Sequence, residues 1–148
     1  ATDMQAAIGC AQLEKLPDFS ALRRKNFAFL RGELCGLEDC FELPKASQNA
    51  DPSWFGFPLT CRKGFSRGRV LSYLEKKNIQ TRMLFAGNLT SHPCFDEMRE
   101  SGEGYRAVGK LDNTDRIMND TFWIGVYPGM SEEMLAFMAK MLKEAVER

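Results

Sequence analysis

The sequence predicts a mixed α/β (α+β) domain, with a sheet of three or four strands, helices packed on one face, and a long kinked helix at the N-terminal end. Three observations predict this fold class. A helical apolar stripe runs through the first 37 residues, short β-rich runs follow between turn residues, and an amphipathic stretch with an N-cap residue comes last. We therefore expect one domain over residues 1–148, made of a broken helix over 1–37 and an α/β body over 38–148.

The N-terminal helix begins with a capping box. Thr2 can accept a hydrogen bond at the N-cap position, and Gln5 stands three residues later. Small apolar residues then share one helical stripe: Met4, Ala7, Ile8 and Ala11. Pro17 lacks the backbone N–H that a helix interior needs, so it predicts a kink or a restart before the stripe continues to Leu37.

Two β-rich runs follow the helix. Residues 41–44 are typical of a short strand ended by proline, and the polar residues 45–52 indicate a linker or an exposed loop. Residues 53–62 are aromatic and apolar and predict a longer strand. Pro58 cannot donate a hydrogen bond to a neighbouring strand, so it favours an edge position or a bulge.

A helix then connects the second β-rich run to a third. Ser66 can cap this helix, which ends near Asn78 and has Val70, Leu71 and Leu74 as its apolar stripe. Residues 79–85 form the next predicted strand. The order strand, helix, strand predicts a crossover connection.

The last part of the chain alternates irregular and regular segments. Residues 91–110 contain several glycines and prolines and predict no regular structure, whereas 111–118 indicate a short helix capped by Asp112 or Asn113. Residues 121–126 predict a further strand. A final helix begins after an N-cap serine and buries a methionine-rich stripe, listed from its start: Ser131, Met134, Met138, Met141, Leu142 and Ala145.

Charge and hydropathy exclude several classes of partner. The chain has 20 basic and 20 acidic side chains, so its net charge of zero gives no attraction to nucleic acid or to an anionic membrane. No apolar run approaches the ~20 residues of a membrane span. The first residues show neither a basic segment nor an apolar segment of a secretory signal, which favours a cytoplasmic location.

The cysteines agree with a reducing compartment. They number five, an odd count, and lie scattered in apolar surroundings, so we expect free, buried structural thiols. Cys35 and Cys40 have the spacing of the first pair in one type of iron–sulfur site. The Cys-x-x-Cys that should follow that pair is absent, so we expect no metal site within this chain.

Polar residues gather where the strand over 79–85 ends. Arg82 interrupts the apolar run and needs either solvent or an anion, and the following loop carries Asn88 and His92, the only histidine. Such a loop can present ligand-binding groups, although an ordinary surface loop is the alternative. For His92, a surface or loop-stitching role competes with general acid/base work. No catalytic motif accompanies them, so nothing here suffices for catalysis.

Three stretches together resemble one known family. Residues 2–16, the run Ile79-Gln-Thr-Arg82 and the run Tyr127-Pro-Gly-Met-Ser131 are similar to the C-terminal part of the sugar aminotransferase/dehydratase family, which is related to aspartate aminotransferase. The resemblance covers essentially the whole chain. It implies the small C-terminal domain of the aspartate-aminotransferase-like fold of fold-type-I pyridoxal-phosphate (PLP) enzymes.

Within that family, the dehydratase branch is the better match. Residues 52–58, 83–90, 113–119 and 121–125 resemble enzymes that act on nucleotide-linked 4-keto-6-deoxy sugars. At the first two of these stretches, the sugar aminotransferases instead carry histidine-containing segments. The resemblance therefore implies removal of the C3 hydroxyl from a nucleotide-sugar substrate.

The resemblance also implies partners and cofactors for a longer enzyme. That enzyme would be a homodimer using pyridoxamine phosphate (PMP) and a [2Fe-2S] cluster, with electrons from an NADH-dependent reductase. Its base histidine, pyridine-nitrogen aspartate and cluster cysteines would belong to a larger domain before residue 1, and His92 does not match the base motif. We expect this chain alone to be inactive, with no catalytic residue and no bound cofactor.

Four residues are candidates for substrate contact by their position in this domain. Arg82 would bind a pyrophosphate or sugar oxygen, Asn88 would donate or accept a hydrogen bond, and Trp54 and Phe85 would form apolar walls. Two other interpretations stay open: the C-terminal domain of a PLP-dependent nucleotide-sugar aminotransferase, and a non-catalytic binding or oligomerisation module.

Overall fold

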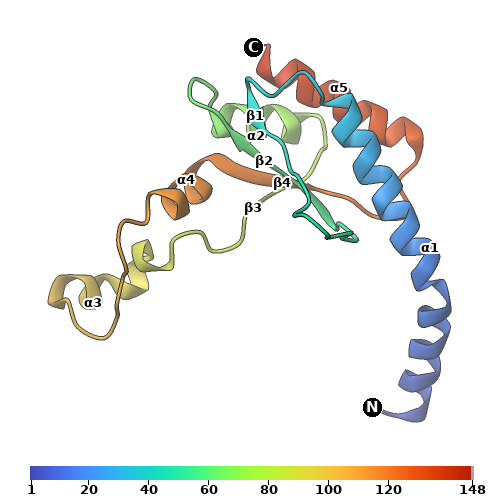
Figure 1. The fold of residues 1–148 in the computed structure, drawn as a ribbon, viewed down its shortest axis with the longest axis horizontal. Coiled ribbons are helices and arrows are strands. Elements are labelled where there is room, and N and C mark those ends of the chain that lie inside the picture. Colours follow the sequence, from blue (N-terminus) through green and yellow to red (C-terminus); the bar gives the residue numbers. More distant parts are fainter. Residues whose placement is uncertain (148) are drawn as a thin grey trace.

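A four-stranded sheet with helices along one face forms the body of the protein in the computed structural model, which describes residues 1–147 (Figure 1). The elements are, in chain order, α1 (Asp3–Glu33), β1 (Phe41–Glu42), β2 (Gly56–Cys61), α2 (Arg67–Lys76), β3 (Thr81–Met83), the 3-10 turns η1 (Leu89–Ser91) and η2 (Pro93–Phe95), α3 (Asp96–Ser101), α4 (Asp112–Asp120), β4 (Thr121–Gly125) and α5 (Glu132–Val146). The predicted α/β fold class, with a small sheet and a long N-terminal helix, is confirmed.

The sheet has the order β1-β2-β4-β3, and every neighbouring pair is antiparallel. Because β2 and β3 both run antiparallel to β4, they are parallel to each other, and α2 makes the predicted crossover between them. The last strand of the chain fills the gap that this crossover leaves. The strands are shorter than the apolar runs that predicted them, because only part of each run pairs with a neighbouring strand.

Pro58 lies in β2, which has neighbours on both sides. On one side, however, β1 pairs only with Thr60 and Cys61. At Pro58 the strand therefore has β4 as its single partner, with Trp123 opposite. The predicted edge position is correct locally, and no neighbour needs the hydrogen bond that proline cannot donate.

The core lies between one face of the sheet and α1, α2 and α5. Phe57 and Leu59 of β2 alternate with outward residues and meet Ile124 and Phe122 of β4 in register. The fully buried large side chains come from all three helices as well as the sheet: Phe41, Phe57, Phe122, Leu30, Leu34, Leu59, Leu74, Ile124, Leu135, Leu142 and Val126. The prediction of helices on one face is thus confirmed for these three, while α4 reaches the opposite face at one end, where Arg116 pairs with Glu42 at 2.8 Å.

Helix α1 is continuous through Pro17, so of the two predicted alternatives, a kink or a restart, the restart is wrong. Proline removes one backbone donor, but the bonds on either side hold the helix together, and Figure 1 shows one ribbon that curves along its length. The capping box is present, with Gln5 N donating to Thr2 Oγ1 and Thr2 N donating to Gln5 Oε1. Helix α1 ends at Glu33, and its N-terminal turns project away from the body with Met4 and Ile8 exposed.

Two local predictions in the second half need correction. Residues 91–110 are not wholly irregular, because they contain η2 and the six-residue helix α3. Helix α4 starts after Leu111 and has no side-chain cap, so neither Asp112 nor Asn113 is the N-cap residue. Both acidic residues of its first turn, Asp112 and Asp115, lie within the helix, where they still favour its positive end.

The expectation of buried thiols holds for Cys61 alone. All five cysteines are free, and Cys40 is half-buried, but Cys10, Cys35 and Cys94 are exposed. Cys10 lies on the projecting turns of α1, and Cys94 lies in η2 outside the core. Apolar neighbours in the sequence did not predict burial: Ile8 near Cys10 is itself exposed, and Cys35 is exposed although the adjacent Leu34 is fully buried.

Candidate functional site

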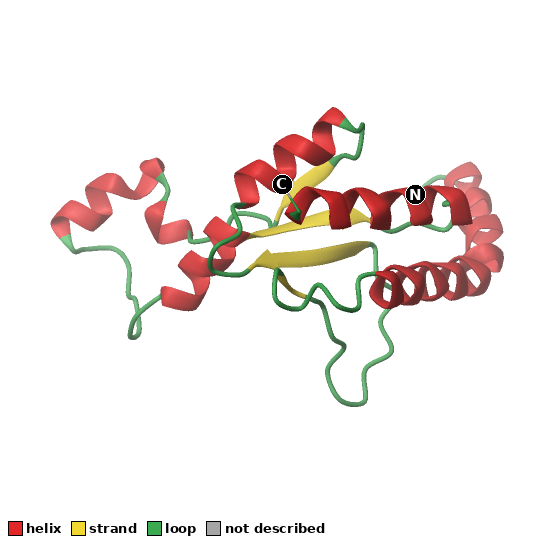
Figure 2. Cartoon of the chain, turned by 90° about the horizontal axis from the view of Figure 1, so that it is seen from above, coloured by secondary structure: helices red, strands yellow, loops and turns green. Residues whose placement is uncertain are grey.

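One face of the sheet is not covered by α1, α2 and α5. A row of three side chains, one aliphatic, one aromatic and one charged, lies across this open face. Pro58 of β2, Trp123 of β4 and Arg82 of β3 are direct cross-strand partners, so they point to this same face. Figure 2 shows the helices along one side of the strands and a long loop on the other. The open face is where this domain can present side chains to a ligand.

An apolar pocket of about 170 Å³ lies on this face. It is lined mainly by aromatic side chains and backbone from β2, β4 and the end of β3: Trp54, Phe55, Gly56, Pro58, Leu84, Phe85 and Trp123. Trp123 is held from two sides, because Phe55 meets it edge to face with ring centroids 5.3 Å apart and its Nε1 donates to the Met83 carbonyl at 3.1 Å. A pocket of this kind suits a ring that offers an apolar face.

Arg82 stands beside the pocket as an exposed cation. Its Nη1 donates to the Thr81 carbonyl at 3.1 Å, and both Nη atoms can donate to the Gln80 side-chain oxygen at 3.0 and 2.8 Å in the amide orientation that satisfies both groups. No carboxylate pairs with Arg82 among residues 1–147. Its guanidinium is therefore oriented by neutral groups and remains available to an anion such as a phosphate.

Trp54 and Phe85, the two predicted apolar walls, both line the pocket but differ in their surroundings. Trp54 is half-buried and stacks on Phe27 of α1, with ring centroids 4.5 Å apart. Phe85 is 74% exposed, and its backbone φ of 52° lies in the left-handed region. A side chain held there costs of order 1–2 kcal/mol relative to ordinary backbone, and such positions cluster at ligand sites.

Asn88 lies away from this pocket, and its amide is bonded within the protein. The residue is only 4% exposed. Its Nδ2 donates to Asp115 Oδ1 of α4 at 2.6 Å, while its Oδ1 accepts from Thr90 N at 3.1 Å and from Thr90 Oγ1 at 2.7 Å. The structure thus makes Asn88 the anchor between η1 and α4, and the contact to substrate predicted for it stays a prediction.

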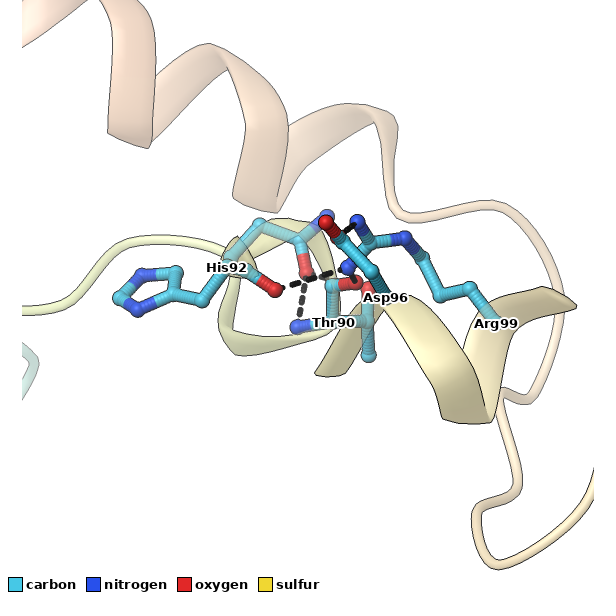
Figure 3. Close-up of polar contacts among 5 residues, drawn as sticks. Thr90, His92, Asp96 and Arg99 are labelled. Carbon is cyan, nitrogen blue, oxygen red and sulfur yellow. Dashed lines mark hydrogen bonds and ion pairs between the residues drawn. The ribbon is translucent and has the colours of Figure 1, made fainter. Parts of the chain in front are cut away.

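His92 belongs to the arm formed by η1, η2 and α3, which projects from the body (Figure 1). One of its ring nitrogens, Nε2, lies 2.7 Å from the Ala86 carbonyl oxygen, which supports the loop-stitching interpretation. Arg99 holds the same arm from α3, donating to the carbonyls of Thr90 at 2.5 Å and His92 at 2.9 Å and pairing with Asp96 (Figure 3). These contacts stabilise the arm internally.

Phe55, Gly56 and Trp123 belong to the pocket, although the sequence did not single them out as site residues. A signal for Trp123 existed, because residues 121–125 alternate and place it out of phase with the buried Phe122 and Ile124. No such signal marked Gly56. Its role appears only when β2 and β4 are brought together.

The described residues hold neither a metal-binding cluster nor a membrane segment. Within residues 1–147, no three His, Cys, Asp or Glu side chains are grouped so that they could hold a metal ion. In the same part of the chain, every helix is too short or too polar to cross a bilayer. The lining of the open-face pocket contains no acid or base, so this pocket can bind and orient a ligand but offers no general acid or base of its own.

The sequence matches one family model and is similar to several known proteins. The model of the DegT/DnrJ/EryC1/StrS aminotransferase family matches residues 1–143. The chain is 46% identical over 145 residues to the lipopolysaccharide biosynthesis protein RfbH of Salmonella typhimurium, covering 97% of the chain and 32% of RfbH. It is 42% identical to dTDP-4-dehydro-2,6-dideoxy-D-glucose 3-dehydratase of Saccharopolyspora spinosa, covering 99% of the chain and 31% of that enzyme. The chain thus spans about a third of the length of these relatives.

Solved structures share the fold. A GDP-4-keto-6-deoxymannose-3-dehydratase with bound GDP-perosamine superposes with a TM-score of 0.79 at 24% identity, covering 94% of this chain and 35% of that one. The sugar aminotransferase CalS13 of Micromonospora echinospora gives a TM-score of 0.74 at 23% identity, covering 93% of this chain and 34% of that one. Both likenesses confirm the aminotransferase-like fold that the sequence predicted.

Proposed function

The chain belongs to the DegT/DnrJ/EryC1/StrS aminotransferase family, and on that premise we propose that it is the C-terminal part of a pyridoxamine-phosphate-dependent 3-dehydratase. Its substrate is a nucleotide-linked 4-keto-6-deoxy sugar, CDP-4-keto-6-deoxy-glucose, in the pathway to the dideoxysugars of lipopolysaccharide. Two relatives support this proposal: RfbH, which is named as a lipopolysaccharide biosynthesis protein, and the S. spinosa enzyme, which is named as a sugar 3-dehydratase.

One observation carries the proposal, namely the juxtaposition of an aromatic pocket and an unpaired arginine on the open face. A nucleotide sugar combines a ring with an apolar C–H face and a diphosphate, and the pocket and Arg82 match these two parts. Trp54 and Phe85 form apolar walls of the pocket, and Asn88 positions the arm through its hydrogen bond to Asp115 of α4.

In this proposal, the cofactor site lies on the part of the longer protein outside the described residues. The pocket lining offers no lysine or histidine to act on pyridoxamine phosphate and no acid for its ring nitrogen. We therefore place the cofactor, the base and the [2Fe-2S] cluster on the rest of a longer protein, and we derive no chemical step through them. In this proposal the chain alone is inactive, and the longer protein is a cytoplasmic homodimer that receives electrons from an NADH-dependent reductase.

A sugar aminotransferase is the second candidate, because an aminotransferase shares the fold. The two candidates differ in the product. Incubated with CDP-4-keto-6-deoxy-glucose, pyridoxamine phosphate and the reductase, the longer protein should release the C3 hydroxyl and yield a 3-deoxy sugar. An amino sugar formed with an amino-acid donor instead would establish the aminotransferase and reject the dehydratase.

The role of Arg82 can be tested in the same protein. Arg82→Ala should raise KM for the nucleotide sugar about tenfold, because an exposed charge-assisted contact is lost, while the thermal unfolding midpoint stays unchanged. Arg82→Lys keeps the charge but loses the planar fork and should recover only part of the affinity. Arg106→Ala, on the exposed segment after α3, is the matched control. An unchanged KM for Arg82→Ala would remove Arg82 from the site.

A further inference from the structure

Gly56 and Trp123 are packed so closely that only glycine fits at position 56. A methyl group at Gly56 would lie 2.5 Å from Trp123 Cε3 and 3.1 Å from Cδ2. The backbone of Gly56 is ordinary strand, so conformational freedom is not the reason for a glycine here. The absent side chain instead lets the indole of Trp123 lie over the backbone of β2.

The indole is fixed by its remaining neighbours. Its Nε1 donates to the Met83 carbonyl of β3, and Phe55 meets it at an interplanar angle of 84°. Contacts to β2, β3 and Phe55 therefore hold one ring in one orientation. Because Trp123 also lines the open-face pocket, this fixed ring forms a rigid part of the pocket surface.

The position of Arg82 indicates which ring is held there. Arg82 is the direct cross-strand partner of Trp123, so its side chain leaves the sheet on the same face as the indole, beside the pocket rather than in its lining. In a nucleotide sugar, the diphosphate is bonded directly to the hexose ring, whereas a ribose separates the base from the diphosphate. The 6-deoxy hexose also offers a methyl group and a C–H face to an apolar surface.

We propose that the deoxyhexose ring packs against the indole of Trp123, a contact surface that we call the seat, and that Gly56 is the positioning residue that lets the indole take this orientation. This inference rests on the proposed function and deepens it. Gly56 touches no reacting atom in the proposal. It acts through the orientation of the indole, so its replacement should affect sugar binding and leave binding of the nucleotide half unchanged.

The fold provides a matched control for Gly56. Gly125 is its register partner on β4, yet a methyl group at Gly125 would meet nothing within 4 Å. Gly56→Ala and Gly125→Ala therefore make the same chemical change at paired strand positions, and only the first displaces Trp123. In a Trp54→Phe background, the fluorescence and near-UV circular dichroism of Trp123 should change in Gly56→Ala and stay unchanged in Gly125→Ala.

Binding in the longer protein then tests the seat. Titrated with CDP-4-keto-6-deoxy-glucose, Gly56→Ala should show a Kd raised at least about tenfold, and Gly125→Ala a Kd within about twofold of wild type. Titrated with CDP alone, all three proteins should show the same Kd. An equal loss for CDP and for the nucleotide sugar, or no loss for either, would overturn the inference. If Gly56→Ala does not fold, Trp123→Leu provides the same comparison without overpacking.

This measurement separates the inference from the proposed function. Binding is measured without turnover, so a protein that seats the sugar on Trp123 but forms an amino sugar would reject the dehydratase and leave the seat standing. If the wild-type protein dehydrates the sugar and Gly56→Ala leaves the Kd for the nucleotide sugar unchanged, the dehydratase stands and the seat is rejected. A wild-type protein that binds no nucleotide sugar would overturn both.

Discussion

Trp54 lies parallel to Phe27, with an angle of 8° between the ring planes. This stack joins the segment before β2 to α1, and Phe27 in turn contacts Phe57 of the core at a centroid distance of 4.9 Å. One wall of the open-face pocket is therefore braced by the hydrophobic core. The wall and the core should respond together when Trp54 is changed.

Trp54→Ala should lower the free energy of unfolding by about 2 kcal/mol, because it removes a half-buried stacked ring. Phe55→Ala removes a ring that is 55% exposed and should cost less than about 1 kcal/mol. Urea unfolding of the two variants measures the difference. Equal losses would show that the stack on Phe27 adds nothing beyond the pocket contacts.

The hydrogen bond between Asn88 and Asp115 predicts a charge effect on stability. Asn88→Asp replaces the donor Nδ2 by an acceptor that faces the Asp115 carboxylate, and should destabilise the protein by about 2–3 kcal/mol. Asp115→Asn in the same chain restores a donor–acceptor pair and should recover most of this loss. A double-mutant cycle by thermal unfolding gives the coupling energy. Additive losses would contradict the pairing.

Cys61 predicts a loss of stability at high pH. Burial, together with the charge of Asp120, raises the pKa of the Cys61 thiol from 9.0 to about 11. Between these values the unfolded chain has lost a proton that the folded chain retains, so the free energy of unfolding falls as the pH rises from about 9 to 11. Urea unfolding across this range should show a steeper fall in wild type than in Cys61→Ala. Parallel curves would reject the shift.

The same burial predicts thiol reactivity at pH 8. A disulfide reagent should modify the exposed Cys10, Cys35 and Cys94 rapidly and Cys61 only after unfolding. Cys40 should react slowly, because burial also raises its pKa. Mass spectrometry of the modified peptides gives the order, and early labelling of Cys61 would show that the core opens under native conditions.

Local patterns predicted the elements of this fold well where the physics is local. The capping box at Thr2, the N-cap serines Ser66 and Ser131 and the apolar stripe of α2 are present as expected, because side chain and backbone interact within one helical turn. The stripe predicted for α5 was only partly right: Met141, Leu142 and Ala145 are buried, but Met134 is 44% exposed, and Leu135 and Ala139 face the core instead. At Pro17 the restart was predicted wrongly, because the helix continues through the proline and its later turns pack against the core. The N-cap of α4 was predicted wrongly. Leu111 is the N-cap residue, and Asp112 and Asn113 both lie inside the first turn of the helix.

The site was only partly predictable, because it depends on pairing between distant strands. Arg82 could be recognised as a polar interruption of an apolar run, and Trp54 and Phe85 by their place beside it. The seat made by Gly56 and Trp123 requires the register between β2 and β4, which no local pattern contains. Asn88 has a residue type suited to ligands, but only the approach of α4 shows that its amide is bonded to Asp115.

The position of β4 has a consequence for how this chain matures. The centre of the sheet is supplied by residues 121–125, so β2 and β3 cannot be joined until most of the polypeptide has left the ribosome. Nascent chains that stop short of Thr121 expose two separate strands with no common neighbour. Until β4 joins them, the unpaired edges of these strands can pair with other chains, so the interval before residues 121–125 emerge is the one in which this domain is most prone to aggregate.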